Sequence, residues 1–70
     1  MEKTLKEWRE LRGYSQGEFA ELIGKSQVTV SHWETGKKKP TKIEDVAVIR
    51  RVLKLKPKDA ISLPDYSTFI

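Results

Sequence analysis

Three glycines, Gly13, Gly24 and Gly36, divide the first half of this 70-residue chain into segments of about a dozen residues. Glycine just past a periodic segment is a common end of a helix, because it adopts a left-handed backbone without steric cost. Between the first two glycines, Ser15 and Glu18 have the spacing of a capping box, in which each side chain accepts from the other residue's backbone N–H. The glycines and caps therefore predict short helices joined by tight turns.

Three helices are predicted in this half, over residues 4–12, 16–23 and 27–35. Their apolar positions recur at helical spacing, at Leu5, Trp8 and Leu11 in the first, at Phe19, Ala20, Leu22 and Ile23 in the second, and at Val30 and Trp33 in the third. The third is weakest on propensity, because each β-branched residue from Val28 to Val30 costs about a few tenths of a kcal/mol in a helix. Helix is still favoured there, since Ser26 and Gly36 cap both ends.

The second half predicts two more helices. Thr41 and Glu44 after the basic loop Lys37-Lys38-Lys39-Pro40 have the spacing of another capping box. The helix that it opens carries an apolar stripe at Ile43, Val46, Ala47, Ile49, Val52 and Leu53. A short fifth helix begins at Pro57 and ends before Leu63-Pro64. The expected fold class is all-α, a compact bundle of five short helices, with one domain over residues 1–64 and a C-terminal tail over residues 65–70.

Composition excludes several classes of protein. A chain of this length forms one small domain, and we expect its single core to give a stability of only about 3–5 kcal/mol. The absence of cysteine and the single histidine exclude a disulfide framework and a thiolate or histidine-rich metal site, so no metal and no cofactor is expected. No apolar stretch approaches the roughly 20 residues of a membrane span and no secretion segment follows Met1, so we expect a cytoplasmic protein.

The charge of the chain is unevenly distributed. Residues 1–35 carry five basic and six acidic side chains, whereas residues 36–70 carry nine basic and four acidic ones. The formal net charge of +4 therefore comes from the second half. A basic excess favours a polyanionic partner, and we expect a phosphate-facing surface in that half.

Two short capped helices joined by a tight turn with glycine describe a helix-turn-helix, whose second helix lies in the DNA major groove. The chain closely resembles phage repressor and Cro-like helix-turn-helix domains, the Xre-type bacterial regulators. The resemblance is carried by Ser15-Gln16-x-Glu18-Phe19-Ala20-x-Leu22-Ile23-Gly24-x-Ser26-x-x-Thr29-Val30-Ser31-x-Trp33-Glu34-x-Gly36 and extends over residues 3 to about 63. It implies a lambda-repressor-like fold and a sequence-specific DNA-binding transcriptional regulator, a repressor from a phage or a bacterium.

Base-reading residues are expected on the face of the third helix that Val30 and Trp33 do not use. That face presents Gln27, Val28, Ser31 and His32 near the helix N-terminus. Glutamine pairs in bidentate fashion with adenine, valine contacts a thymine methyl group, and serine and histidine exchange hydrogen bonds with base edges. An apolar side chain exposed there makes sense only with a partner.

The phosphate contacts are assigned from the resemblance and from the helix dipole. Gln16 matches the family position at the N-terminus of the second helix that holds a phosphate, which the dipole also favours. We expect further backbone contacts from the turn and from the basic loop, at Lys25, Ser26, Lys37, Lys38, Lys39 and Lys42. The resemblance also implies that Arg9 and Glu34 form an internal ion pair with a structural role.

Trp33 has the spacing of a core residue more than that of a base-stacking one. An enzyme is disfavoured, because His32 has no serine or cysteine nucleophile with an orienting carboxylate, and a chain this small has little room for a substrate cavity. A protein-interaction module of the same fold, an antitoxin or a polymerase adaptor with secondary DNA binding, is the alternative function.

The resemblance further implies a homodimer on a palindromic DNA operator, with two recognition helices about 34 Å apart. The dimer contact is expected from the fifth helix and the tail, whose apolar residues are Ile61, Leu63, Tyr66, Phe69 and Ile70. The expected partners are thus double-stranded DNA and a second copy of the chain, with no membrane and no metal.

Overall fold

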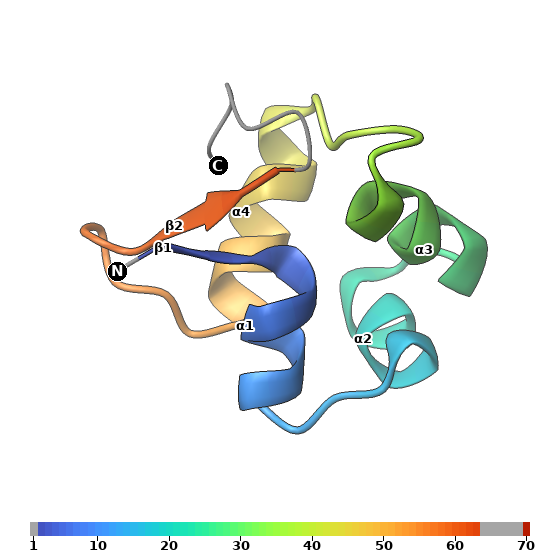
Figure 1. Cartoon of the computed structure of the whole chain (residues 1–70), viewed down its shortest axis with the longest axis horizontal. Helices are drawn as coiled ribbons and strands as arrows, with labels where there is room; N and C mark the ends of the chain where they lie inside the picture. Colours follow the sequence, from blue (N-terminus) through green and yellow to red (C-terminus); the bar gives the residue numbers. More distant parts are fainter. Residues whose placement is uncertain (1, 64–69) are drawn as a thin grey trace.

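The computed structural model describes residues 2–63 and residue 70. In that part, four helices form the body of the domain, and a short two-stranded sheet packs against α1 (Figure 1). The helices are α1 (Leu5–Leu11), α2 (Gln16–Ile23), α3 (Gln27–Thr35) and α4 (Ile43–Val52), and the strands are β1 (Glu2–Thr4) and β2 (Ala60–Ser62). The structure is mostly helical, as expected, but the expected number of five helices is wrong.

The predicted caps define α2 and α3. The Ser15 hydroxyl accepts from the Glu18 N–H while the Glu18 carboxylate accepts from the Ser15 N–H, so the predicted capping box is confirmed. Gly24 ends α2 with φ +73°, a left-handed conformation that costs glycine little. The Ser26 hydroxyl accepts from the Thr29 N–H and caps α3. The preference for helix over strand in this segment is therefore confirmed despite its β-branched residues.

The fifth helix is replaced by a turn and by strand β2. This strand pairs in parallel with β1, with Glu2 opposite Ala60 and Thr4 opposite Ser62. On its other side, Ile61 and Ile70 exchange two backbone hydrogen bonds, of 2.8 and 3.1 Å. Ile61 and Leu63 are buried two residues apart, which is the period of a strand and not that of a helix. The prediction failed because it gave weight to Pro57 as a helix start and ignored this spacing.

The N-terminal segment also differs from the prediction. Residues 2–4 form a strand, and α1 begins only at Leu5. A capping box that was not predicted fixes this junction, because the Thr4 hydroxyl accepts from the Glu7 N–H and the Glu7 carboxylate accepts from the Thr4 N–H. Trp8 then joins α1 to the sheet, since its indole N–H donates to the Ala60 carbonyl at 3.1 Å.

One hydrophobic core joins all four helices and β2. Its buried apolar residues are Leu5, Trp8, Phe19, Ala20, Ile23, Val30, Trp33, Ile49, Leu53, Ile61 and Leu63. The expectation that Val30 and Trp33 insert α3 into the core is thereby confirmed. Burying one such large side chain contributes roughly 1.5–3 kcal/mol, so this cluster supplies most of the stabilisation of the domain.

Four residues expected on apolar faces, Leu11, Leu22, Ile43 and Ala47, lie at the surface instead. Leu11 and Leu22 are more than half exposed, and Ile43 is 85% exposed. Ile43 precedes the buried Ile49 by six residues, which turns it about 240° around the helix and away from the core. The amphipathic pattern therefore overestimated how far the core extends along α1, α2 and α4.

The predicted capping box at the start of α4 is also wrong. The helix begins at Ile43, its N-cap is Lys42, and no side chain of the described residues caps it. Thr41 lies one residue too early to occupy the cap. Acidic side chains at Glu44 and Asp45 in the first turn complement the positive end of the helix dipole instead.

The expected dimer contact needs correction as well. Ile61 and Leu63 are buried in the core of one chain and are not available to a second copy. Ile70 packs partly buried against the same core, while Tyr66, Phe69 and the rest of the expected tail over residues 65–70 lie outside the described residues.

Among the residues that the structure describes, no helix has both the length and the apolar character of a membrane-spanning segment.

The opposite environments of two isoleucines give a direct test of this fold. Ile61→Val removes a methylene from the core and should lower the free energy of unfolding by about 0.5–1.5 kcal/mol. The same substitution at the exposed Ile43 should change it by less than about 0.5 kcal/mol. Urea unfolding measures both, and equal effects would contradict the core described here.

Candidate nucleic-acid interface

The four expected base-reading residues lie together along the outer side of α3. Gln27 and Val28 are exposed, with Val28 at 62%, while Ser31 and His32 are half-buried one turn later. The buried Val30 and Trp33 hold the opposite side of the helix in the core. Helix α3 packs chiefly on α2 and lies at the right-hand edge of the molecule in Figure 1.

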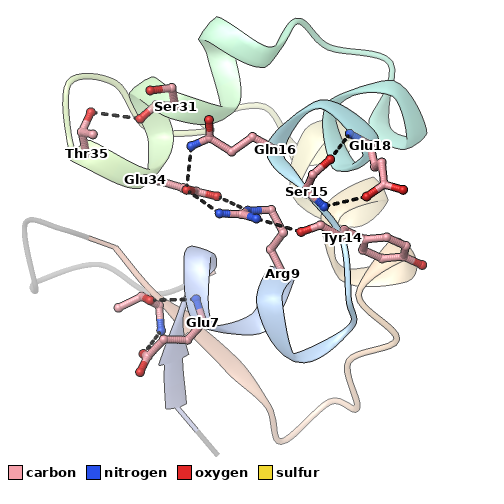
Figure 2. Close-up of polar contacts among 10 residues, drawn as sticks. Glu7, Arg9, Tyr14, Ser15, Gln16, Glu18, Ser31, Glu34 and Thr35 are labelled. Atoms are coloured by element: carbon pink, nitrogen blue, oxygen red, sulfur yellow. Dashed lines mark hydrogen bonds and ion pairs between the residues drawn. The ribbon is translucent and has the colours of Figure 1, made fainter.

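The polar groups of this face are uncommitted. Within residues 2–63 and 70, no hydrogen bond engages the side chains of Gln27, Ser31 or His32. The backbone carbonyls are used instead. The Thr35 hydroxyl donates to the Ser31 carbonyl (Figure 2), and the His32 carbonyl accepts from the Thr35 hydroxyl and from the Lys38 N–H. The backbone is thereby fixed while the side chains keep their donors and acceptors for another molecule.

A buried network joins α3 to the start of α2. Arg9 Nε lies 2.6 Å from Glu34 Oε2, and Arg9 Nη2 donates to Glu34 Oε1 at 3.2 Å. Arg9 Nη1 donates to the Tyr14 carbonyl at 2.7 Å, in the loop before α2. Both side chains of the ion pair are less than a tenth exposed, and the Glu34 carboxylate raises the pKa of Arg9. This ion pair fixes three segments of the chain to one another.

Glu34 also accepts a hydrogen bond from Gln16, a contact that the sequence did not predict. Gln16 Nε2 donates to Glu34 Oε1 at 3.0 Å, as Figure 2 shows. A carboxylate accepts only, so the amide nitrogen of Gln16 must face it, and one of its two N–H groups is left for another acceptor. No sequence signal pointed to this contact, because the two residues are eighteen positions apart and meet only when α2 and α3 pack together.

Gln16 stands at the first position of α2, where backbone N–H groups are not used within the helix. The Glu18 N–H is satisfied by the Ser15 hydroxyl. The Ser15 backbone N–H, helped by the Ser15 hydroxyl, lowers the pKa of Glu18 below its ordinary value of 4.5 and so keeps the capping carboxylate ionised. The positive end of the helix dipole and the Gln16 amide together make this helix start a polar, donor-rich corner beside α3.

The expected phosphate-binding residues divide into two groups. Lys37, Lys38, Lys39 and Lys42 are exposed in the loop between α3 and α4. In the turn between α2 and α3, Lys25 Nζ forms an ion pair with Asp45 Oδ1 at 3.1 Å and the Ser26 hydroxyl caps α3. The loop therefore offers most of the positive charge beside α3.

The comparisons with known proteins agree with this geometry. A family model described as "Helix-turn-helix" matches residues 5–59, which include all four helices. No curated protein and no solved structure matches the chain. The match covers more than half of the chain and therefore establishes its family.

The ion pair between Arg9 and Glu34 predicts an unequal response to single and double substitutions. Glu34→Ala leaves a buried guanidinium without its carboxylate and should cost about 3–5 kcal/mol of stability. Arg9→Met combined with Glu34→Ala removes both charges and should be more stable than the single variant. Urea unfolding of the set tests this, and a double variant less stable than Glu34→Ala would contradict it.

The capping carboxylates predict a loss of stability in acid. The pKa values of Glu7 and Glu18 lie below the ordinary 4.5 in the folded chain, mainly because backbone N–H groups of Thr4 and Ser15 donate to the two carboxylates. The stability that the two capping carboxylates contribute is complete above their pKa in the unfolded chain. It is lost as the pH falls through their lower pKa values in the folded chain. Glu18→Gln cannot titrate, so its melting temperature should fall less between about pH 5 and pH 3 than that of the parent chain.

The matched control for that measurement is Glu21→Gln, which removes a carboxylate from the same helix outside the capping box. It should follow the parent chain over the whole pH range. A Glu18→Gln variant with the same acid sensitivity as the parent would show that the capping carboxylate contributes nothing to the pH dependence.

Proposed function

The chain belongs to the phage repressor and Cro-like helix-turn-helix family, the Xre-type regulators, and we propose that it is a sequence-specific repressor that reads double-stranded DNA with α3. The observation that carries the proposal is the exposed, uncommitted face of α3. An apolar Val28 at 62% exposure is costly in water and is accounted for by a methyl-bearing partner such as thymine.

The chemistry of that face matches base edges in the major groove. Gln27 has a donor and an acceptor at the spacing of adenine N7 and N6. Ser31 and His32 follow one turn later and exchange hydrogen bonds with either partner of a base pair. An α-helix with its side chains is about 10–12 Å in diameter, so the exposed side of α3 can enter a major groove about 12 Å wide.

We propose that the corner at the start of α2 and the loop after α3 hold the DNA backbone on either side of α3. Gln16 donates its second amide N–H to a phosphate while Glu34 holds the first. The remaining contacts come from Lys25, Ser26, Lys37, Lys38, Lys39 and Lys42. These contacts neutralise phosphates and release counterions, so they supply affinity and carry no sequence information.

We further propose that two copies of the domain, residues 1–64, bind a palindromic operator. A single α3 contacts only a few base pairs, and two helices about 34 Å apart on one face of the duplex multiply the specificity. An operator that overlaps a promoter is then closed to polymerase by occupancy alone, so repression requires no additional surface. The assignment includes no catalytic residue, cofactor or metal.

Substitutions in the two parts of the interface should behave differently. Gln27→Ala should lower the discrimination at one base pair by about 1–3 kcal/mol. Lys38→Ala should weaken binding to all sequences alike and lower the slope of log affinity against log salt by about one unit. Titrations with a selected site and with single-base variants over a range of salt concentrations measure both effects.

Equal effects of Gln27→Ala on every sequence would mean that α3 does not read bases. Weak binding of the parent chain without sequence preference would favour the other function that this fold supports, a protein-interaction module such as an antitoxin or a polymerase adaptor. An unchanged salt slope in Lys38→Ala would show that Lys38 and its loop lie away from the DNA backbone.

A further inference from the structure

A groove far from α3 has a composition that DNA binding does not explain. It lies between α1 and the segment before β2, has a volume of about 520 Å³, and is lined by Trp8, Leu11, Arg12, Lys56, Lys58 and Asp59. That segment lies at the left of the molecule in Figure 1, whereas α3 lies at the right. A partner in this groove would leave α3 accessible to DNA.

The side of the groove formed by α1 and its C-terminal end combines two apolar residues with one arginine. Trp8 is only 3% exposed, and its indole N–H is bonded to β2. Leu11 stands at the rim, 57% exposed, although it belongs to the same helix. Arg12 lies over the Trp8 ring at 5.6 Å from its centroid and donates to the Leu53 carbonyl at 2.7 Å and the Lys54 carbonyl at 3.4 Å. These bonds hold the Arg12 guanidinium in place and use two of its five N–H groups.

The opposite wall is an ordered turn. The Lys56 N–H donates to Asp59 Oδ2 at 3.1 Å, the Asp59 N–H donates to the Lys56 carbonyl at 2.9 Å, and Arg50 Nη2 donates to that same carbonyl at 2.8 Å. Pro57 further restricts the backbone between them. The two lysines are thus presented on a fixed backbone, so binding a ligand between them would require little additional ordering.

The groove is positively charged around its apolar centre. Arg12, Lys56 and Lys58 supply three positive charges against the one carboxylate of Asp59. Five of the nine basic residues of the second half of the chain lie at positions 50–58, outside the loop assigned to DNA. Of these five, Lys56 and Lys58 line the groove, together with the exposed Leu11.

We propose that this groove is a docking site for an acidic segment of a partner protein, which inserts an apolar side chain beside Leu11 while its flanking carboxylates pair with Arg12 and Lys56. A carboxylate accepts bidentate bonds from the free N–H groups of a guanidinium that is already positioned. The partner binds on the side of the domain away from α3, so one chain holds DNA and the acidic segment together.

A nucleic acid fits the groove less well. Bases bind to proteins by stacking on exposed aromatic faces, and Trp8 is too deeply buried to offer one. The exposed Leu11 gains nothing from a phosphate or a sugar, whereas an apolar side chain of a protein removes it from water. The charge of the groove is consistent with either partner, but its apolar part distinguishes them.

The test uses two short synthetic peptides, each a run of glutamates around one central residue, leucine in the first and serine in the second. Binding is followed by the NMR signal of the Trp8 indole N–H, with that of Trp33 in the same protein as the internal reference. The leucine peptide should shift the Trp8 signal and bind about tenfold more tightly than the serine peptide, because only leucine buries apolar surface in the groove.

Two charge reversals of equal size serve as matched variants. Lys56→Glu with Lys58→Glu should weaken binding of the leucine peptide by about tenfold or more and leave DNA affinity within about threefold at roughly 150 mM salt. Lys37→Glu with Lys38→Glu should do the reverse. This pairing separates the groove from the DNA interface, so failure of one assignment leaves the other measurable.

Four results would overturn the proposal. The first is equal binding of the two peptides, which would show that only charge acts. The second is a shift confined to the Lys37–Lys42 loop. The third is that the variant Lys56→Glu with Lys58→Glu and the variant Lys37→Glu with Lys38→Glu bind the leucine peptide with the same affinity. The fourth is displacement of the peptide, followed by the NMR signals of the groove, by a single-stranded oligonucleotide that carries no bases. This result would assign the surface to nucleic acid instead.

Discussion

The buried ion pair between Arg9 and Glu34 is the contact on which the arrangement of this domain depends. Two charges taken out of water are stable only when their partners are complete, and here both carboxylate oxygens and three guanidinium nitrogens are bonded. The pair joins α1 to the end of α3 and to the loop before α2. The angle between α2 and α3, on which any groove-reading geometry depends, is therefore fixed by electrostatics as well as by the apolar core.

The same carboxylate connects this scaffold to the proposed interface. Glu34 accepts from Gln16, the residue that stands at the start of α2, so the proposed phosphate contact and the proposed reading helix move as one body. Packing then decides which side of α3 remains exposed, because Val30 and Trp33 occupy the core and leave Val28 in water. Stability and recognition thus use opposite sides of one nine-residue helix.

Local signals in the sequence predicted the helix-turn-helix well, and long-range ones were missed. Ser15, Gly24 and Ser26 act through hydrogen bonds and backbone angles within a few residues, so their effects can be inferred from spacing alone. Strand β2 depends on a partner strand nearly sixty residues away, and its one signal, Ile61 and Leu63 two positions apart, was outweighed by Pro57. The contact of Gln16 with Glu34 and the exposure of Ile43 likewise depend on packing that no local pattern encodes.

The proposed function requires that the exposed side of α3 reads a DNA sequence. Selection of binding sites from a random duplex library at about 150 mM salt tests it most directly, because non-specific contacts weaken at that ionic strength. We expect enrichment of one sequence, arranged as an inverted repeat with half-sites about one helical turn apart. A selected pool in which no sequence is enriched over the input library would contradict sequence reading by α3.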